Sequence, residues 1–165
     1  MKRTVFTLAL LAVASLFTFV VSADSPHYKK GPSVVDNGAT ATATGSVAGL
    51  GNGDVIVTLS FPDATGTTVC TTPSGGNDAP GQNPSVPAAT SGSQFIDNPK
   101  NGKLTFTVTT DPPPNPTAAA AGCPNKNWIA RFDNITFGCG TLTIQQETFQ
   151  GSGNYEVVLQ TTVCL

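Results

Sequence analysis

Hydrophobic and polar residues alternate with a period of two in several stretches of the chain. In residues 103–109, Leu104, Phe106 and Val108 alternate with lysine and threonine, which is typical of a half-buried antiparallel strand. The same alternation predicts strands over residues 54–61, with Val55, Val57, Leu59 and Phe61 inward, over residues 141–144, and over residues 155–163, with Tyr155, Val157, Leu159 and Val163 inward. Weaker patterns predict strands over residues 39–47, 67–71 and 94–96.

The apolar pattern of residues 127–137 changes phase partway along. Trp128, Ala130 and Phe132 share one face, whereas Ile135 and Phe137 fall on the other. An extra residue in a strand has this effect, so the pattern predicts a bulge or tight turn at residues 133–134. No apolar stripe of helical period follows the first 23 residues. Seven or eight short strands predict an all-β fold, an antiparallel β-sandwich of the immunoglobulin-like or a related Greek-key kind.

Two long stretches interrupt the strand pattern. Residues 72–92 are rich in proline and glycine, and residues 111–122 begin with a run of prolines that leads into four alanines. Proline cannot donate to a sheet ladder, so we expect both stretches to form surface loops. Long loops in compact domains are often functional or disordered.

The first 23 residues carry the pattern of a secretory signal peptide. Lys2 and Arg3 precede an apolar run, and Val21, Ser22 and Ala23 provide the small residues of a cleavage site. The alternative is a retained anchor, because the apolar run reaches the lower length limit for crossing a bilayer. We expect cleavage, which would leave residues 24–165 as a single secreted, extracellular domain without a membrane span.

The four cysteines form an even set in a chain predicted to fold outside the cell. Cys70, Cys123, Cys139 and Cys164 permit two disulfides in three connectivities. Their spacing contains no CxxC pair, so a redox-active dithiol or a zinc site is not indicated. A bridge between Cys70 and Cys123 would contribute up to about 4 kcal/mol, and one between Cys139 and Cys164 about 3.5 kcal/mol, on the chain-entropy account.

The charge balance argues against a nucleic-acid partner. The chain has 8 Lys and Arg and 10 Asp and Glu, so loss of Lys2 and Arg3 leaves a net charge of 6 − 10 = −4. Binding to a phosphate backbone requires clustered basic residues. The sequence shows no basic stripe.

Familiar catalytic and metal-binding patterns are not found. His27 is the only histidine and lies near the expected new amino terminus, where we expect it in a solvated tail. Most aspartates stand beside Asn or Gly in turn-like settings, as at Asp54 and Asp133. We therefore assign no catalytic residue, metal ligand or cofactor. Asn134, in Asn-Ile-Thr, is the one possible glycosylation acceptor.

Several short motifs carry a resemblance to a known family. They are Ser-Pro-His-Tyr at 25–28, Ala-Gly-Leu-Gly at 48–51, Cys70 followed by Gly-Gly-Asn at 75–77, Lys-Asn-Gly at 100–102 and Cys-Pro at 123–124. With these motifs the chain resembles a family of small secreted bacterial proteins of uncharacterised function. The resemblance implies an exported β fold in which Cys70 pairs with Cys123, and it carries over no catalytic residues.

Two interpretations of function follow. The first is a non-catalytic extracellular structural or binding module that self-associates through exposed strand edges, because the outward strand positions are mostly threonine with few charges to protect an edge. In this interpretation residues 33–47 donate a strand to a neighbouring molecule. The second is a carbohydrate-binding or enzyme-inhibitory protein that uses the loops at residues 72–92 and 111–122.

Overall fold

The structure is a computed structural model that describes residues 25–165. The predicted signal peptide, residues 1–23, lies outside the described residues. The described chain forms eleven strands, a 3-10 turn and a one-turn helix, as follows: β1 (His27–Asp36), β2 (Ala41–Ala48), β3 (Val55–Phe61), β4 (Thr65–Thr71), β5 (Asp78–Pro80), β6 (Val86–Pro87), β7 (Thr90–Ile96), η1 (Lys100–Gly102), β8 (Lys103–Thr109), α1 (Ala118–Ala121), β9 (Ile129–Thr136), β10 (Cys139–Glu147) and β11 (Tyr155–Cys164).

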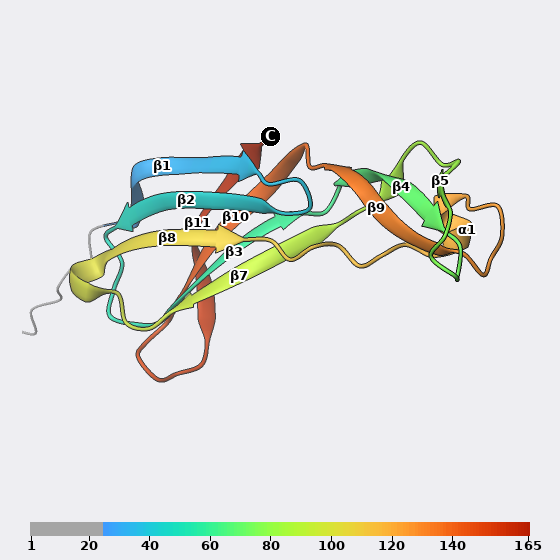
Figure 1. Cartoon of the computed structure of the whole chain (residues 1–165). Helices are drawn as coiled ribbons and strands as arrows, with labels where there is room; N and C mark the ends of the chain where they lie inside the picture. The colour runs from blue at the N-terminus through green and yellow to red at the C-terminus, as the bar shows by residue number, and fades with distance from the viewer. Residues whose placement is uncertain (1–24) are drawn as a thin grey trace, which may run out of the picture.

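Seven of the strands form two sheets that pack face to face (Figure 1). One sheet has the order β1-β2-β8 and the other the order β11-β10-β3-β7. Lettered A, B, C, C′, E, F and G along the chain, these strands form the sheets ABE and GFCC′. This is the pairing of an immunoglobulin-like Greek key with strand C′ on the GFC sheet. The predicted antiparallel β-sandwich is therefore confirmed.

The alternating residues of the two sheets fill the space between them. The predicted inward residues of β3 and β8 are all buried, together with Leu142 and Ile144 of β10 and Val47 of β2. The threonines between them on β8 face outward and are exposed. Each buried aliphatic or aromatic side chain contributes roughly 1.5–3 kcal/mol relative to an exposed one, so this shared core holds the two sheets together.

A further sheet, made of β4, β5, β6 and β9, extends from the sandwich along one continuous ribbon. Because it lies outside the two sheets of the sandwich, it is called the second sheet below. Ser60 pairs with Thr141 in β3–β10, and Thr65 pairs with Thr136 in β4–β9, which is the same register on either side of a short break. β5 and β6 pair with two different parts of β4. In Figure 1 this second sheet and α1 lie to the right of the sandwich.

The predicted irregularity in residues 133–134 is confirmed as a bulge in β9. Thr67 pairs with Asn134 and Thr68 pairs with Phe132, so Asp133 is the extra residue. Ile135, beyond the bulge, belongs to the sandwich core, whereas Ala130, before it, packs in a small separate cluster. Phe132, also before the bulge, packs against the sandwich core as well, so the apolar residues of β9 contribute to two different cores.

The structure differs from the expected strand count and from the expected tail. Eleven strands are present in residues 25–165 instead of seven or eight, because the second sheet adds four to the seven of the sandwich. The residues around His27 do not form a solvated tail: they begin β1, since Tyr28 and Val34 pack against the sandwich core. His27 itself is exposed.

The two predicted loops contain short regular elements. Residues 72–92 include β5 and β6 and the start of β7, and residues 111–122 end in α1. Pro80 and Pro87 each end a very short strand, where a missing N–H group costs least. The helix is capped at its start by the Thr117 hydroxyl, which accepts from the Ala120 N–H group, and it ends at Gly122 in the left-handed conformation.

Two inward residues of the C-terminal strand, Tyr155 and Val157, were predicted wrongly: they share one face N-terminal to a bulge, and neither packs against the sandwich core. Val157 is 55% exposed, because β11 has a bulge in which Val158 is the extra residue: Ile144 pairs with Leu159 and Gln145 with Val157. The bulge reverses the faces of β11 on its N-terminal side, so Val158 packs against the core in place of Val157. Leu159 and Val163, beyond the bulge, keep their predicted inward side.

The expectation that residues 33–47 form a strand available for donation is also wrong. These residues are divided between β1 and β2, and β2 lies in the middle of its sheet, paired with β1 on one side and β8 on the other. A strand with both edges bonded cannot accept or donate pairing without unfolding the sheet.

Both disulfides are formed, and no described cysteine is free. Cys70 pairs with Cys123, as the resemblance implied, and this bond joins β4 to the segment after α1. Cys139 pairs with Cys164, its direct partner in the β10–β11 ladder. One bond thus stabilises the second sheet and the other the end of the sandwich.

Candidate functional site

Three loops meet at the end of the sandwich that lies away from the second sheet. They are the β2–β3, β7–β8 and β10–β11 loops, residues 49–54, 97–102 and 148–154. The pairings Ala48 with Lys103, Val55 with Ile96 and Glu147 with Tyr155 place the strand ends that carry these loops at one end. In variable immunoglobulin domains the loops at one end of the sandwich form the binding surface. We name this region the loop end.

A side chain near the end of a strand holds each of the three loops. Gln146, which is buried, accepts a hydrogen bond from the Gly51 N–H group at 3.1 Å through Oε1. Asp54 accepts one from the Asn98 N–H group at 3.1 Å through Oδ1. Both interactions join different strands, so each fixes one loop against a neighbouring element.

Glu147 organises the third loop. Its carboxylate is 5% exposed and accepts hydrogen bonds from the N–H groups of Gly153 at 2.6 Å and Gly151 at 2.9 Å. These bonds, chiefly the one from Gly153, hold the pKa of Glu147 below its usual range. The pKa of nearby Tyr155 is raised by desolvation and by the negative charges of Glu147 and Asp54.

The β7–β8 loop has an unusual backbone conformation. Asn98 and Asn101 have φ angles of 34° and 56°, and they are the two non-glycine residues with positive φ in the described chain. Asparagine adopts this region more readily than most residues because its side chain is short and polar. A cavity of about 570 Å³ lies against this loop and is bordered by Asn52, Asp97 and Gln150 as well.

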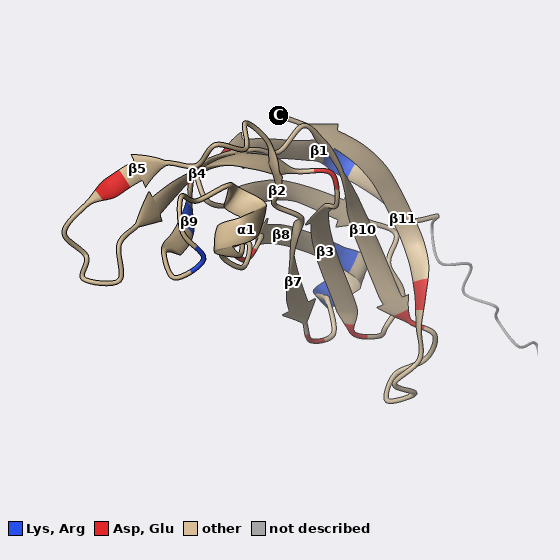
Figure 2. Cartoon of the chain, turned by 90° about the vertical axis from the view of Figure 1, so that its right-hand side faces the viewer, with Lys and Arg blue, Asp and Glu red and all other residues tan. Residues whose placement is uncertain are grey.

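Acidic residues gather around the loop end. Figure 2 shows red segments where β3, β7, β10 and β11 meet these loops, and they correspond to Asp54, Asp97, Glu147 and Glu156. The carboxylates of Asp54 and Glu147 accept hydrogen bonds from backbone N–H groups, as described above. No group of three or more histidine, cysteine or acidic side chains suited to a metal ion occurs in residues 25–165.

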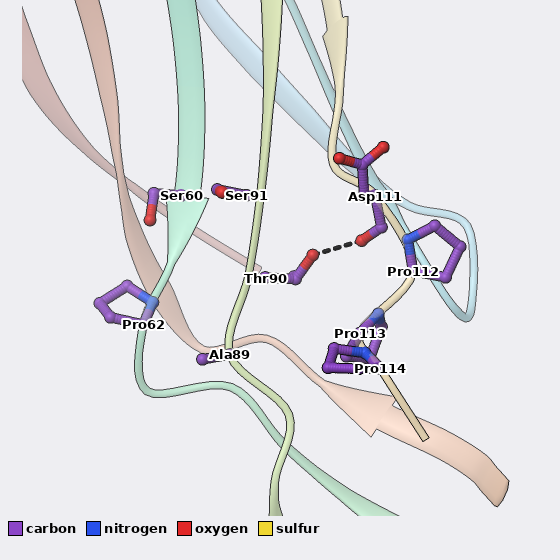
Figure 3. A pocket seen from close by; sticks show the side chains of 9 residues that line it. All are labelled: Ser60, Pro62, Ala89, Thr90, Ser91, Asp111, Pro112, Pro113 and Pro114. Carbon is purple, nitrogen blue, oxygen red and sulfur yellow. Dashed lines mark hydrogen bonds between the residues drawn. The ribbon is translucent and has the colours of Figure 1, made fainter. Parts of the chain in front are cut away.

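A second cavity, of about 390 Å³, lies at the opposite end of the sandwich (Figure 3). The proline-rich segment 111–114 runs beside the start of β7, and Ser60 of β3 and Pro62, just after β3, form the other side. The Thr90 hydroxyl donates a hydrogen bond to the Asp111 carbonyl oxygen. Prolines form much of this wall, and its polar side chains are those of Ser60, Thr90, Ser91 and Asp111.

The two sides of the sandwich differ: hydrogen bonds join the elements on one side, whereas β1 and β11 on the other lie close together without pairing. On the first side, the Asp111 N–H group donates to the Ser91 carbonyl oxygen and the Thr107 N–H group donates to Gln94 Oε1, both at 3.0 Å. These bonds join β7 to β8. On the other side, no strand of the described chain pairs with the outer edge of β1 or β11.

The edges of β1 and β11 differ in their protection. β1 contains Gly31 and Pro32, two register shifts and the charged residues Lys29 and Lys30, all of which discourage pairing with another strand. The last part of β11, Leu159–Cys164, pairs with β10 without any shift and contains neither charge nor proline.

The direction of the free backbone groups on β11 follows from its ladder. The Leu165 N–H group donates to the Gly138 carbonyl oxygen at 2.9 Å, so this is a hydrogen-bonded pair. Bonded and non-bonded pairs alternate in an antiparallel ladder. Val163 and Thr161 therefore direct their N–H and C=O groups at β10. Cys164, Thr162 and Gln160 direct theirs at the free edge.

Asn134 and Trp128 lie in and beside the second sheet. Asn134 is exposed in β9, so its side chain is at the surface; its glycosylation stays a prediction. Trp128 is half-buried and packs against the small cluster of Cys70, Ala121 and Ala130.

An ion pair crosses the surface of the second sheet. The Arg131 Nη2 group and Asp78 Oδ2 lie 2.8 Å apart, and the Thr71 hydroxyl donates to Asp78 Oδ1 at 2.6 Å. The bond from Thr71 is the main reason that the pKa of Asp78 lies below its usual range, and Arg131 adds to it. Both charged side chains are about half exposed, so the pair stabilises the sheet only weakly.

Comparison with known proteins returned no matching family model, curated protein or solved structure. The resemblance to a secreted bacterial family therefore stays a prediction. Within residues 25–165 no helix is long and apolar enough to cross a membrane.

Sequence reasoning missed both the loop end and the β11 edge as sites. Residues 97–102 carried a signal, since Asp-Asn-Pro-Lys-Asn-Gly is rich in turn formers, but a turn pattern does not show which other loops lie beside it. The predicted binding loops, residues 72–92 and 111–122, lie elsewhere, in the second sheet and beside the second cavity.

Proposed function

We propose that this protein is a secreted, disulfide-stabilised, non-catalytic module that associates with a second copy of itself through the free edge of β11. Two disulfides and an all-β sandwich fit a protein that works outside the cell. A non-catalytic role is supported by the carboxylates, because those of Asp54, Asp78 and Glu147 are held in structural hydrogen bonds. The predicted leader supports export.

The observation that carries the proposal is the unprotected second half of β11. Over Leu159–Cys164 the strand is regular, uncharged and free of proline, and its outer edge is unpaired. The disulfide between Cys139 and Cys164 prevents the end of this strand from fraying away from β10. A rigid free edge of this kind accepts an added strand with little loss of conformational entropy.

A two-fold axis at Thr162 satisfies the free groups of this edge. Antiparallel pairing of β11 with its own copy then sets Thr162 opposite Thr162 and Gln160 opposite Cys164, all with outward N–H and C=O groups. This register forms roughly six main-chain hydrogen bonds. Glu156, the one charged residue of the strand, lies beyond the paired segment, so no like charges face each other. The result is one continuous sheet of eight strands.

Light scattering on the oxidised mature protein tests the proposal. We expect the mass to rise from one chain to two over an about hundredfold increase in concentration, because association follows mass action. Thr162→Pro removes an outward N–H group without breaking the β10 ladder, so it should keep the protein monomeric. Thr162→Val keeps that N–H group and should still dimerise.

Circular dichroism should first show that Thr162→Pro is folded, and Gln160→Pro provides a second edge variant if it is not. A monomer at every concentration would contradict the proposal. A folded Thr162→Pro protein that still dimerises would also contradict it.

A further inference from the structure

The cavity at the loop end is a candidate ligand site that is separate from the β11 edge. Its volume of about 570 Å³ falls in the range of small-molecule sites. All three loops contribute to its lining: Asn52 from the first, Asp97, Asn98, Lys100 and Asn101 from the second, and Gln150 from the third. Convergence of separate loops on one cavity is how immunoglobulin-like sandwiches build binding sites.

The lining chemistry is polar and rich in amides. Asn52, Asn98, Asn101 and Gln150 each offer both hydrogen-bond donors and an acceptor. Most small-molecule pockets are lined largely by apolar groups, so this cavity suits a ligand with many hydroxyl groups.

The charges at this end favour a neutral ligand. One acidic and one basic side chain, Asp97 and Lys100, line the cavity and balance each other. Asp54, Glu147 and Glu156 add three negative charges nearby and Lys103 adds one positive charge, so the surroundings are net negative, which disfavours an anion. A cation would need free carboxylates, but those of Asp54 and Glu147 are already bonded to backbone N–H groups.

The site is fixed before any ligand arrives. Gln146, Asp54 and Glu147 each anchor one of the three loops, and Gln146 and Glu147 are buried. Anchored loops lose little conformational freedom on binding, which leaves more of the interaction energy for affinity. Two buried polar side chains that serve only to hold surface loops are well explained by a site that must keep its shape.

We propose that the cavity at the loop end binds a neutral saccharide, with the amides of Asn98, Asn101 and Gln150 bonding to its hydroxyl groups. The site lies at the opposite end of the sandwich from the disulfide-bound end of β11. Dimerisation and saccharide binding are therefore independent, and either proposal can fail alone.

Nuclear magnetic resonance of the oxidised mature protein tests this binding. The probes are neutral hexasaccharides of glucose, xylose and mannose, each at about 10 mM, a concentration at which binding with a millimolar dissociation constant is detected. We expect at least one probe to shift the amide signals of residues 97–101 and 148–152. Calcium chloride and an anionic sialylated trisaccharide are added in separate experiments, to test whether a cation or an anion binds in place of a neutral sugar.

A variant at the cavity and a matched control elsewhere show whether binding takes place at the loop end. Asn98→Gly with Asn101→Gly removes both amide side chains and keeps the backbone unstrained, because glycine adopts positive φ at no steric cost. We expect the affinity to fall by about tenfold or more, given the hydrogen bonds that are lost. Asn115→Gly, an exposed asparagine outside the loop end, is the matched control and should leave binding unchanged.

Four outcomes would overturn the proposal. They are no shifts with any hexasaccharide, shifts centred on residues 111–114 instead of the loop end, the same shifts with calcium or the anionic sugar alone, and undiminished binding by the double glycine variant. Thermal unfolding of the variants shows that they are folded.

Discussion

The rings of Phe61 and Phe137 meet edge to face at the point where the ribbon leaves the sandwich for the second sheet. Their centroids are 5.2 Å apart and their planes are inclined by 61°. Both side chains are buried, Phe61 at the end of β3 and Phe137 just before β10. Aromatic pairs in this arrangement add about 0.5–1.5 kcal/mol to the effect of burial, so the pair stabilises the junction.

Removing one of these rings should therefore destabilise the protein strongly. We expect Phe137→Ala to lower the free energy of unfolding by about 3–5 kcal/mol, because a large cavity is left in the core. Urea denaturation measures the change. Phe149→Ala removes an exposed ring and should change stability by no more than about 0.5 kcal/mol. Equal effects of the two substitutions would contradict the packing described here.

The stability should depend on pH through Glu147. Its pKa is lower in the folded chain than in the unfolded chain, so its charged form stabilises the fold above the unfolded pKa. That stabilisation is lost as pH falls through the folded pKa. Glu147→Gln should accordingly flatten the fall in urea midpoint between neutral and acidic pH.

Glu156→Gln is the matched control for this experiment, because Glu156 is exposed on β11. It should leave the pH dependence close to that of the wild type. If Glu147→Gln had the same pH profile as the wild type, the carboxylate would not be holding the β10–β11 loop.

The two disulfides should differ in their reactivity toward reductant. Cys139 and Cys164 are both exposed, whereas Cys70 is completely buried and its partner Cys123 is half-buried. A thiolate must reach a sulfur atom to attack it, so limited dithiothreitol should open the bond between Cys139 and Cys164 first. Alkylation followed by peptide mass spectrometry shows which cysteines react. Simultaneous labelling of all four would contradict the difference in access.

Close contact between β7 and β8 should make Gly92 sensitive to substitution. A Cβ atom on Gly92 would lie 2.0 Å from the Thr109 carbonyl oxygen. Gly92→Ala must therefore push the two strands apart, at a cost of about 1–3 kcal/mol. Gly76→Ala meets no atom closer than 3.9 Å and serves as the control in thermal unfolding. Similar stability of the two variants would show that the β7–β8 contact is loose.

Much of the fold follows from local alternation in the sequence. Leu104, Phe106 and Val108 predicted β8 correctly because one strand face meets the core and the other meets water. The extra residue at Asp133 was also predictable, since the apolar positions of β9 serve two cores. Val157 was not, because a valine fits either face and only the pairing with β10 reveals the bulge in β11.

The candidate sites depend on relationships that alternation does not encode. β1 was missed because Gly31 and Pro32 interrupt its pattern and few of its residues reach the core. The loop end needs the strand order, since Asn52, Asn98 and Gln150 come from loops far apart in sequence. The edge of β11 likewise becomes visible only when β2, expected to be exposed, is seen in the middle of its sheet.

Amide hydrogen exchange at different protein concentrations tests self-association through β11 most directly. The N–H groups of Thr161 and Val163 point at β10 and should be protected at any concentration. Those of Gln160 and Thr162 point at the free edge, so we predict fast exchange in dilute solution and slow exchange in concentrated solution. Exchange at Gln160 and Thr162 that stays equally fast at both concentrations would contradict the account.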